Sequence, residues 1–140
     1  MASTAKIEAF LAEPRNVIVA GIRRDGTPHL TPNWFLWDGV GFYVSTTRHR
    51  AKYAIFRRDP RAQLAIDDGP GYRTVLVRAT ADVREDLATG LSRFRALYAK
   101  YSRPVLSDEE LLISLTEEGR VLLAFTPDRP MERWTCWGLD

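Results

Sequence analysis

The stretch NVIVAGIRRDGTPHLTPNWFLWDGVGFYVST, residues 16–46, contains three strand-like runs separated by two turn signals. Each run is rich in the β-branched and aromatic residues that favour strands. The turn signals are Asp25-Gly26 and Asp38-Gly39, where glycine supplies the positive φ of a tight hairpin turn. The three runs are residues 16–22, 29–37 and 40–46. We predict that they form consecutive antiparallel strands in a meander.

Two prolines mark the second run as unusual for a strand. Pro28 and Pro32 have no backbone N–H, so neither can donate a hydrogen bond to a neighbouring strand. We therefore expect this strand to be irregular or to lie at the edge of the sheet.

The rest of the chain continues this mixture of strands and short helices. Apolar residues at helical spacing predict helices over residues 4–12, 50–58 and 85–102. Ser107 and Glu110 form a capping-box pattern that starts a further helix, and Gly119 is suited to follow its end. The remaining strand patterns cover residues 61–68, 72–83 and 120–127. Six strands with helices between them predict a mainly β chain with flanking helices, folded as one small antiparallel barrel domain over residues 1–140.

The composition limits the class of protein and its expected location. At 140 residues and 45% hydrophobic residues, the chain is long and apolar enough for one packed core. No apolar run approaches the roughly 20 residues of a membrane helix, and the start of the chain does not resemble a signal peptide. The single cysteine, Cys136, excludes an internal disulfide framework. We expect a cytoplasmic protein that does not enter a membrane.

The basic residues gather in one place. The net charge is only +2, yet residues 45–62 hold six basic residues and a single acid. Within this stretch, Ser45, Thr46 and Thr47 end a strand and a basic run leads into the next helix. Helix N-termini, hydroxyl groups and arginine forks all suit a phosphate, although a solvated helix start has the same composition. The pattern leaves both interpretations open.

Other chemical patterns are missing from the sequence. His29 and His49 have no cysteine or carboxylate at ligand spacing, so we expect no metal site. Nucleotide-binding glycine motifs and a nucleophile elbow are also absent. Trp34, Phe35 and Trp37 lie in an apolar run, which favours core packing or the wall of a ligand site over stacking on a nucleic acid. A phosphate site with little acid–base machinery is typical of an enzyme whose cofactor carries the chemistry.

Several blocks together resemble a known family. They are DGTPHLTP, FYVSTTRHRAK, RRDPRAQLAI, VLVRATADV and RVLLAFTPDR, in this order. Their order and spacing are similar to those of the split β-barrel flavin and deazaflavin oxidoreductases, the relatives of pyridoxamine 5′-phosphate oxidase. The resemblance implies a six-stranded antiparallel split β-barrel of the FMN-binding type. It also implies a homodimer with the cofactor in a groove between the subunits.

The resemblance assigns roles to particular residues. Arg50 and Lys52 would hold the cofactor phosphate, with Ser45, Thr46 and Thr47 at the adjoining strand end. The residues beside the flavin or deazaflavin ring would be Thr31, Pro32 and Asn33, with His29 and Tyr53 as neighbours. Trp134 would reach the site of the partner subunit. No catalytic side chain is implied.

The sequence of the basic stretch and the short length of the chain most resemble the branch that uses the deazaflavin coenzyme F420. The phospholactyl-polyglutamate tail of F420 would meet additional cations such as Arg48 and Arg57, whereas FMN ends at its phosphate. We therefore expect an F420-dependent oxidoreductase that transfers a hydride between the cofactor and an unsaturated organic small molecule. The alternatives are an FMN oxidoreductase of the same fold and a non-catalytic carrier of a cofactor or tetrapyrrole. We expect no nucleic-acid partner.

Overall fold

The structure is a computed structural model that describes residues 2–140, and its elements follow the predicted order closely. The helices are α1 (Thr4–Ala12), α2 (Ala51–Arg58), α3 (Leu87–Lys100), α4 (Asp108–Glu117) and the 3-10 turn η1 (Met131–Arg133). The strands are β1 (Val17–Ile22), β2 (Pro28–Asn33), β3 (Leu36–Trp37), β4 (Phe42–Thr47), β5 (Arg61–Asp67), β6 (Thr74–Arg84), β7 (Arg120–Pro127) and β8 (Thr135–Trp137). The predicted mainly β fold with flanking helices is confirmed.

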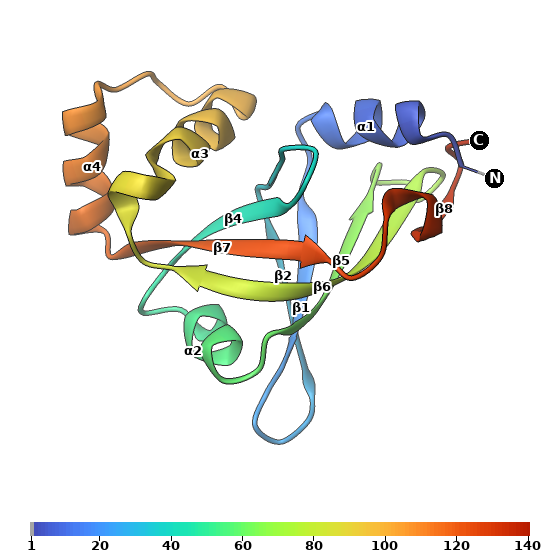
Figure 1. Cartoon of the computed structure of the whole chain (residues 1–140), viewed down its shortest axis with the longest axis horizontal. Coiled ribbons are helices and arrows are strands. Elements are labelled where there is room, and N and C mark those ends of the chain that lie inside the picture. Colours follow the sequence, from blue (N-terminus) through green and yellow to red (C-terminus); the bar gives the residue numbers. More distant parts are fainter. Residues whose placement is uncertain (1) are drawn as a thin grey trace.

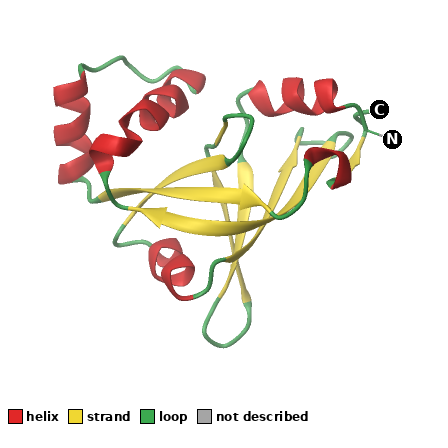
Figure 2. Cartoon of the chain, viewed as in Figure 1, coloured by secondary structure: helices red, strands yellow, loops and turns green. Residues whose placement is uncertain are grey.

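All the strands form one curled antiparallel sheet, an open or split barrel (Figures 1 and 2). Among residues 2–140 the order is β2-β1-β5-β6-β7-β4-β3, with β8 added beside β6. The prediction of six strands captured the six longer ones. It missed β8 in the tail, and it joined β2 and β3 into one strand.

The predicted meander is wrong, because β2 and β4 are not neighbours. β2 pairs only with β1 and lies at one end of the sheet, as the prolines indicated, whereas β3 pairs with β4 at the other end. The chain crosses between the two ends at Trp34 and Phe35. This crossing is what leaves the barrel split.

Side chains from the end of α3 hold this crossing in place. The backbone N–H of Phe35 donates to the hydroxyl of Tyr101 at 3.0 Å, and that hydroxyl donates to the carbonyl of Arg15 at 2.6 Å. The Nζ of Lys100 donates to the carbonyls of Phe35 and Leu11 at 3.0 and 2.8 Å. Lys100, the last residue of α3, and Tyr101, its C-cap, therefore satisfy backbone groups that a strand partner would otherwise satisfy.

The core fills the inside of the curled sheet. Alternating residues of the central strands point inward and are fully buried, among them Val19, Leu64, Val77 and Phe125. On the other face of β4 and β7, Tyr43, Leu122 and Ala124 pack against α3 and α4. Figure 1 shows these two helices together at one side of the sheet, α1 at the top and α2 below.

A glycine allows α2 to pack closely against the barrel. A Cβ atom on Gly21 in β1 would lie 2.8 Å from Ile55 Cγ2 and 3.0 Å from Phe56 Cζ. Both residues belong to α2 and are buried. Gly21 therefore sets the position of the helix that carries Lys52 and follows Arg50.

We expect the Gly21→Ala and Gly90→Ala substitutions to have opposite effects on stability. Gly21→Ala overpacks the contact with α2 and should lower the free energy of unfolding by about 1–3 kcal/mol. Gly90 lies in α3, where an added Cβ would meet only ordinary contacts from 3.5 Å, so alanine should stabilise the helix by up to about 1 kcal/mol. Urea unfolding of both variants checks this. Equal effects would contradict the close approach of α2.

We also expect Lys100 to make stability depend on pH. Burial, with a smaller effect of Arg15, lowers the pKa of Lys100 from 10.5 to about 8. Between these two pH values the unfolded chain binds more protons at this site than the folded chain, so this contribution to stability rises with pH. The unfolding free energy of wild type minus that of Lys100→Met should therefore increase from pH 8 to 10. A difference that stays flat or falls would contradict it.

Candidate functional site

The split of the barrel contains a polar cavity of about 400 Å³. On one side is the end of β2, whose outer edge pairs with no strand of residues 2–140. On the other side is the end of β4, which pairs with β7 but, beyond Tyr43, not with β3. Four of the predicted site residues line this cavity, namely Pro32, Asn33, Ser45 and Arg50. The structure therefore brings residues from both ends of the sheet to one place.

Arg50 stands at the N-cap of α2, beside this cavity. Among residues 2–140 its side chain has no hydrogen bond and no ion pair. The first turn of α2 has no acidic residue, so the unpaired N–H groups and partial positive charge of the helix end are not compensated locally. Arg50 is thus a cation without a counter-ion at a site suited to an anion.

Lys52 lies behind Arg50 and is only 4% exposed. Its Nζ donates to Thr31 Oγ1 at 3.1 Å, and the Thr31 hydroxyl donates to Asn33 Oδ1 at 3.1 Å. Burial, and secondarily the charge of Arg50, lowers the pKa of Lys52. This chain of hydrogen bonds ties α2 to β2. It also occupies the Asn33 oxygen, which leaves the Asn33 amide N–H groups as donors for a ligand.

The other predicted residues on β2 and β4 divide between the two faces of their strands. His29 lies on the same side of β2 as Thr31 and Asn33, and burial, Arg23 and Lys52 lower its pKa. On β4, Ser45 and Thr47 share the outer face. The Ser45 hydroxyl accepts a hydrogen bond from Arg120 at 3.4 Å. Thr46 points the other way, into the barrel, and is completely buried. The described residues offer no hydrogen-bond partner to its hydroxyl.

Tyr53 belongs to a separate cluster around Glu85. The Tyr53 hydroxyl donates to Glu85 at 2.7 Å and accepts from Arg57 at 3.0 Å, while Arg48 lies 3.2 Å from the same carboxylate oxygen. These contacts, led by the hydrogen bond from Tyr53, lower the pKa of Glu85. Arg48 and Arg57, which we expected to meet an anionic cofactor tail, therefore already share an acid of this chain.

Sequence reasoning missed the far wall of the cavity, which comes from later parts of the chain. Tyr98 belongs to α3, Arg103 to the connection between α3 and α4, and Arg120 to the start of β7. Trp34 joins them from the crossing, where its ring stacks on Tyr101 at 4.6 Å. Only the interpretation of Trp34 as a possible ligand wall pointed here. Arg103 and Arg120 lie outside the basic stretch, so charge clustering could not reveal them.

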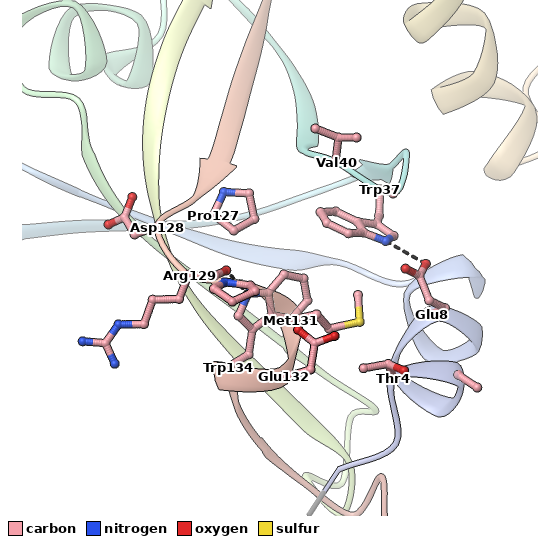
Figure 3. A pocket seen from close by; sticks show the side chains of 13 residues that line it. Thr4, Glu8, Trp37, Val40, Pro127, Asp128, Arg129, Met131, Glu132 and Trp134 are labelled. Carbon is pink, nitrogen blue, oxygen red and sulfur yellow. Dashed lines mark hydrogen bonds between the residues drawn. The ribbon is translucent and has the colours of Figure 1, made fainter.

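A second, larger groove of about 790 Å³ has the opposite character (Figure 3). It lies between α1, the turn after β3 and the segment after β7, and none of the ten predicted site residues lines it. Its acids are Glu8, Asp128 and Glu132, against one arginine, Arg129. Trp134 packs here against Trp37 at 5.3 Å, edge to face. The acidic lining is unsuited to a phosphate, so the cavity at the split is the better candidate.

No group of three or more His, Cys, Asp or Glu side chains within residues 2–140 is arranged to hold a metal ion. Over the same range, no helix has the length and apolar character needed to cross a membrane.

Comparisons with known proteins identify the family of the chain. Residues 3–129 match the sequence pattern of the family described as pyridoxamine 5′-phosphate oxidase. The chain belongs to this family. Its fold is one that binds flavin-type cofactors, and the proteins that share it commonly form dimers. No curated protein matches the chain in sequence.

Solved structures show the same fold. One similar structure is an F420 reductase, with 28% identity, a TM-score of 0.69, and coverage of 87% of this chain and 93% of that one. Another is a conserved hypothetical protein from Mycobacterium tuberculosis, with 26% identity, a TM-score of 0.82, and coverage of 98% and 85%. The heme storage protein HutZ from Vibrio cholerae shares only the fold, at 14% identity, a TM-score of 0.71 and 93% coverage of both chains.

Proposed function

We propose that this member of the family is an F420-dependent oxidoreductase that acts on an unsaturated organic small molecule. The observation that carries the proposal is the pair formed by Arg50 and Lys52. Both cations lie near the start of α2, and neither has an acidic partner among residues 2–140. They fit the phosphate end of a flavin-type cofactor, because a phosphate accepts charge-assisted hydrogen bonds from both.

The remaining residues fit the same ligand. Thr31 and Lys52 orient Asn33, whose free N–H groups can donate to a carbonyl or ring nitrogen. Trp34 supplies an aromatic surface beside it. A bound deazaflavin supplies a hydride donor at C5. In this proposal the protein binds the phosphate, positions the ring and limits water, and solvent provides the proton.

F420 is preferred over FMN for two reasons. One similar structure at 28% identity is an F420 reductase. The cavity also holds two arginines that make no ion pair within residues 2–140, Arg50 and Arg103, and a single phosphate at Arg50 accounts for only one of them. FMN remains the alternative, since both cofactors place a phosphate at Arg50 and Lys52. A carrier without catalytic activity would bind a cofactor equally well but transfer no hydride.

Paired titrations of the protein with F420 and FMN, followed by cofactor fluorescence, test this site. The Arg50→Gln/Lys52→Met variant should lose two charge-assisted contacts, each of about 1.5–3 kcal/mol, and so bind F420 at least about a hundredfold more weakly. Arg61→Ala is the matched control, because Arg61 lies in the same basic stretch but is held by Asp59. Wild-type affinity in the double variant would show that the phosphate is bound elsewhere.

We further propose that the protein is a homodimer through the outer face of β2, β1 and β5. This face is not covered by a helix, and its outward residues are mainly apolar (Figure 1). Ile18 and Leu30 are 36% and 58% exposed, with Ala20 and Ala65 between them and Pro32 at the rim of the cavity. A partner on this face would therefore adjoin the cofactor site.

We expect Leu30→Asp to convert the dimer into a monomer, since a carboxylate would be buried at an apolar contact. Ile113→Asp is the control, because Ile113 is 52% exposed but lies on α4. Sedimentation equilibrium measures the mass of each variant. A dimeric Leu30→Asp protein, or a monomeric wild type, would contradict this interface.

A further inference from the structure

We infer that the cavity at the split contains a second anion subsite, centred on Arg103, that binds a carboxylate of the ligand. This inference rests on the proposed function only in placing the ligand in that cavity. The subsite is separate from Arg50 and Lys52, because Arg103 comes from the connection between α3 and α4.

The guanidinium of Arg103 is held in position without an acid. It lies 5.4 Å from the ring centre of Tyr98 and 5.9 Å from that of Trp34. No carboxylate within residues 2–140 makes an ion pair with it. Its backbone is fixed as well, since the Arg103 N–H donates to the Tyr98 carbonyl at 2.9 Å. Arg103 is exposed and lines the cavity, so its charge is accessible to a ligand there.

The charges around the cavity leave this cation for a ligand. The three arginines that line it face one acid, Glu118, and Arg120 already binds that carboxylate at 2.7 Å. Arg50 and Arg103 remain uncompensated. Two separated cations in a cavity favour a ligand with two anionic groups, or two ligands with one each. A phosphate at Arg50 accounts for only one of them.

The surroundings of Arg103 indicate the chemical class. An arginine fork matches a carboxylate in two parallel hydrogen bonds. One face of the Trp34 ring stacks on Tyr101, with 6° between the planes, and the side chain is still 38% exposed, so the rest of the ring can meet a conjugated group. The charge of Arg103 predicts a carboxylate, which can belong to the substrate or to the glutamate tail of the cofactor. The aromatic surface of Trp34 favours the substrate, with its carboxylate on an unsaturated system.

Calorimetric titrations of the protein with four ligands distinguish these two sources. Cinnamate and its neutral amide test a conjugated carboxylate, and F420 and FMN test the cofactor tail. We expect Arg103→Gln to weaken binding of cinnamate or of F420 about tenfold, with no change for cinnamamide and FMN. Loss of cinnamate alone places the carboxylate on the substrate. Loss of F420 alone places it on the cofactor tail.

Two further variants separate a charge effect from a structural one. Arg103→Lys keeps the charge but not the fork, so its carboxylate affinity should lie between those of wild type and Arg103→Gln. Arg95→Gln removes an arginine of α3 that binds Asp108, and it should behave like wild type. The inference is overturned if Arg103→Gln binds all four ligands normally, or if it weakens FMN equally. It is also overturned if wild type binds cinnamate no more tightly than cinnamamide and F420 no more tightly than FMN.

Failure of the proposed function gives a different pattern. In that case the Arg50→Gln/Lys52→Met variant keeps its cofactor affinity, while Arg103→Gln still loses cinnamate. The two sets of variants therefore report separately on the two ends of the cavity.

Discussion

The contact between the end of α3 and the backbone of Phe35 determines the architecture of this protein. Tyr101 and Lys100 satisfy both backbone groups of Phe35, so the chain can leave β2 and cross to the other end of the sheet without an unpaired polar group in the interior. The crossing separates β2 from β4, and the separation creates the cavity. A helix that follows the crossing by some 50 residues in the sequence thus determines where the candidate site lies.

Local patterns were sufficient for the elements but not for their neighbours. The turn signals, the capping box at Ser107 and the prolines of β2 act over a few residues, and the structure confirms what they predicted. The meander was wrong because the crossing depends on Tyr101, whose role no local pattern reveals. For the site, the basic stretch identified Arg50, but Arg103 and Arg120 reach the cavity only through the packing of α3 and β7.

Two hollows of the molecule carry opposite excesses of charge. The cavity at the split has an excess of arginine, whereas the groove beside α1 has an excess of acids around Trp37 and Trp134. The cavity at the split therefore attracts an anionic ligand, whereas the groove beside α1 repels it. The small net charge of the chain conceals this polarity.

The prolines of β2 have a consequence for the life of the protein in a crowded solution. An unpaired strand edge invites a strand of another molecule, which is the usual start of aggregation. Pro28, Leu30 and Pro32 are alternate residues of β2. Of the three, only Leu30 has a backbone N–H that could donate to another strand. The open edge of β2 is therefore a poor template for a foreign strand.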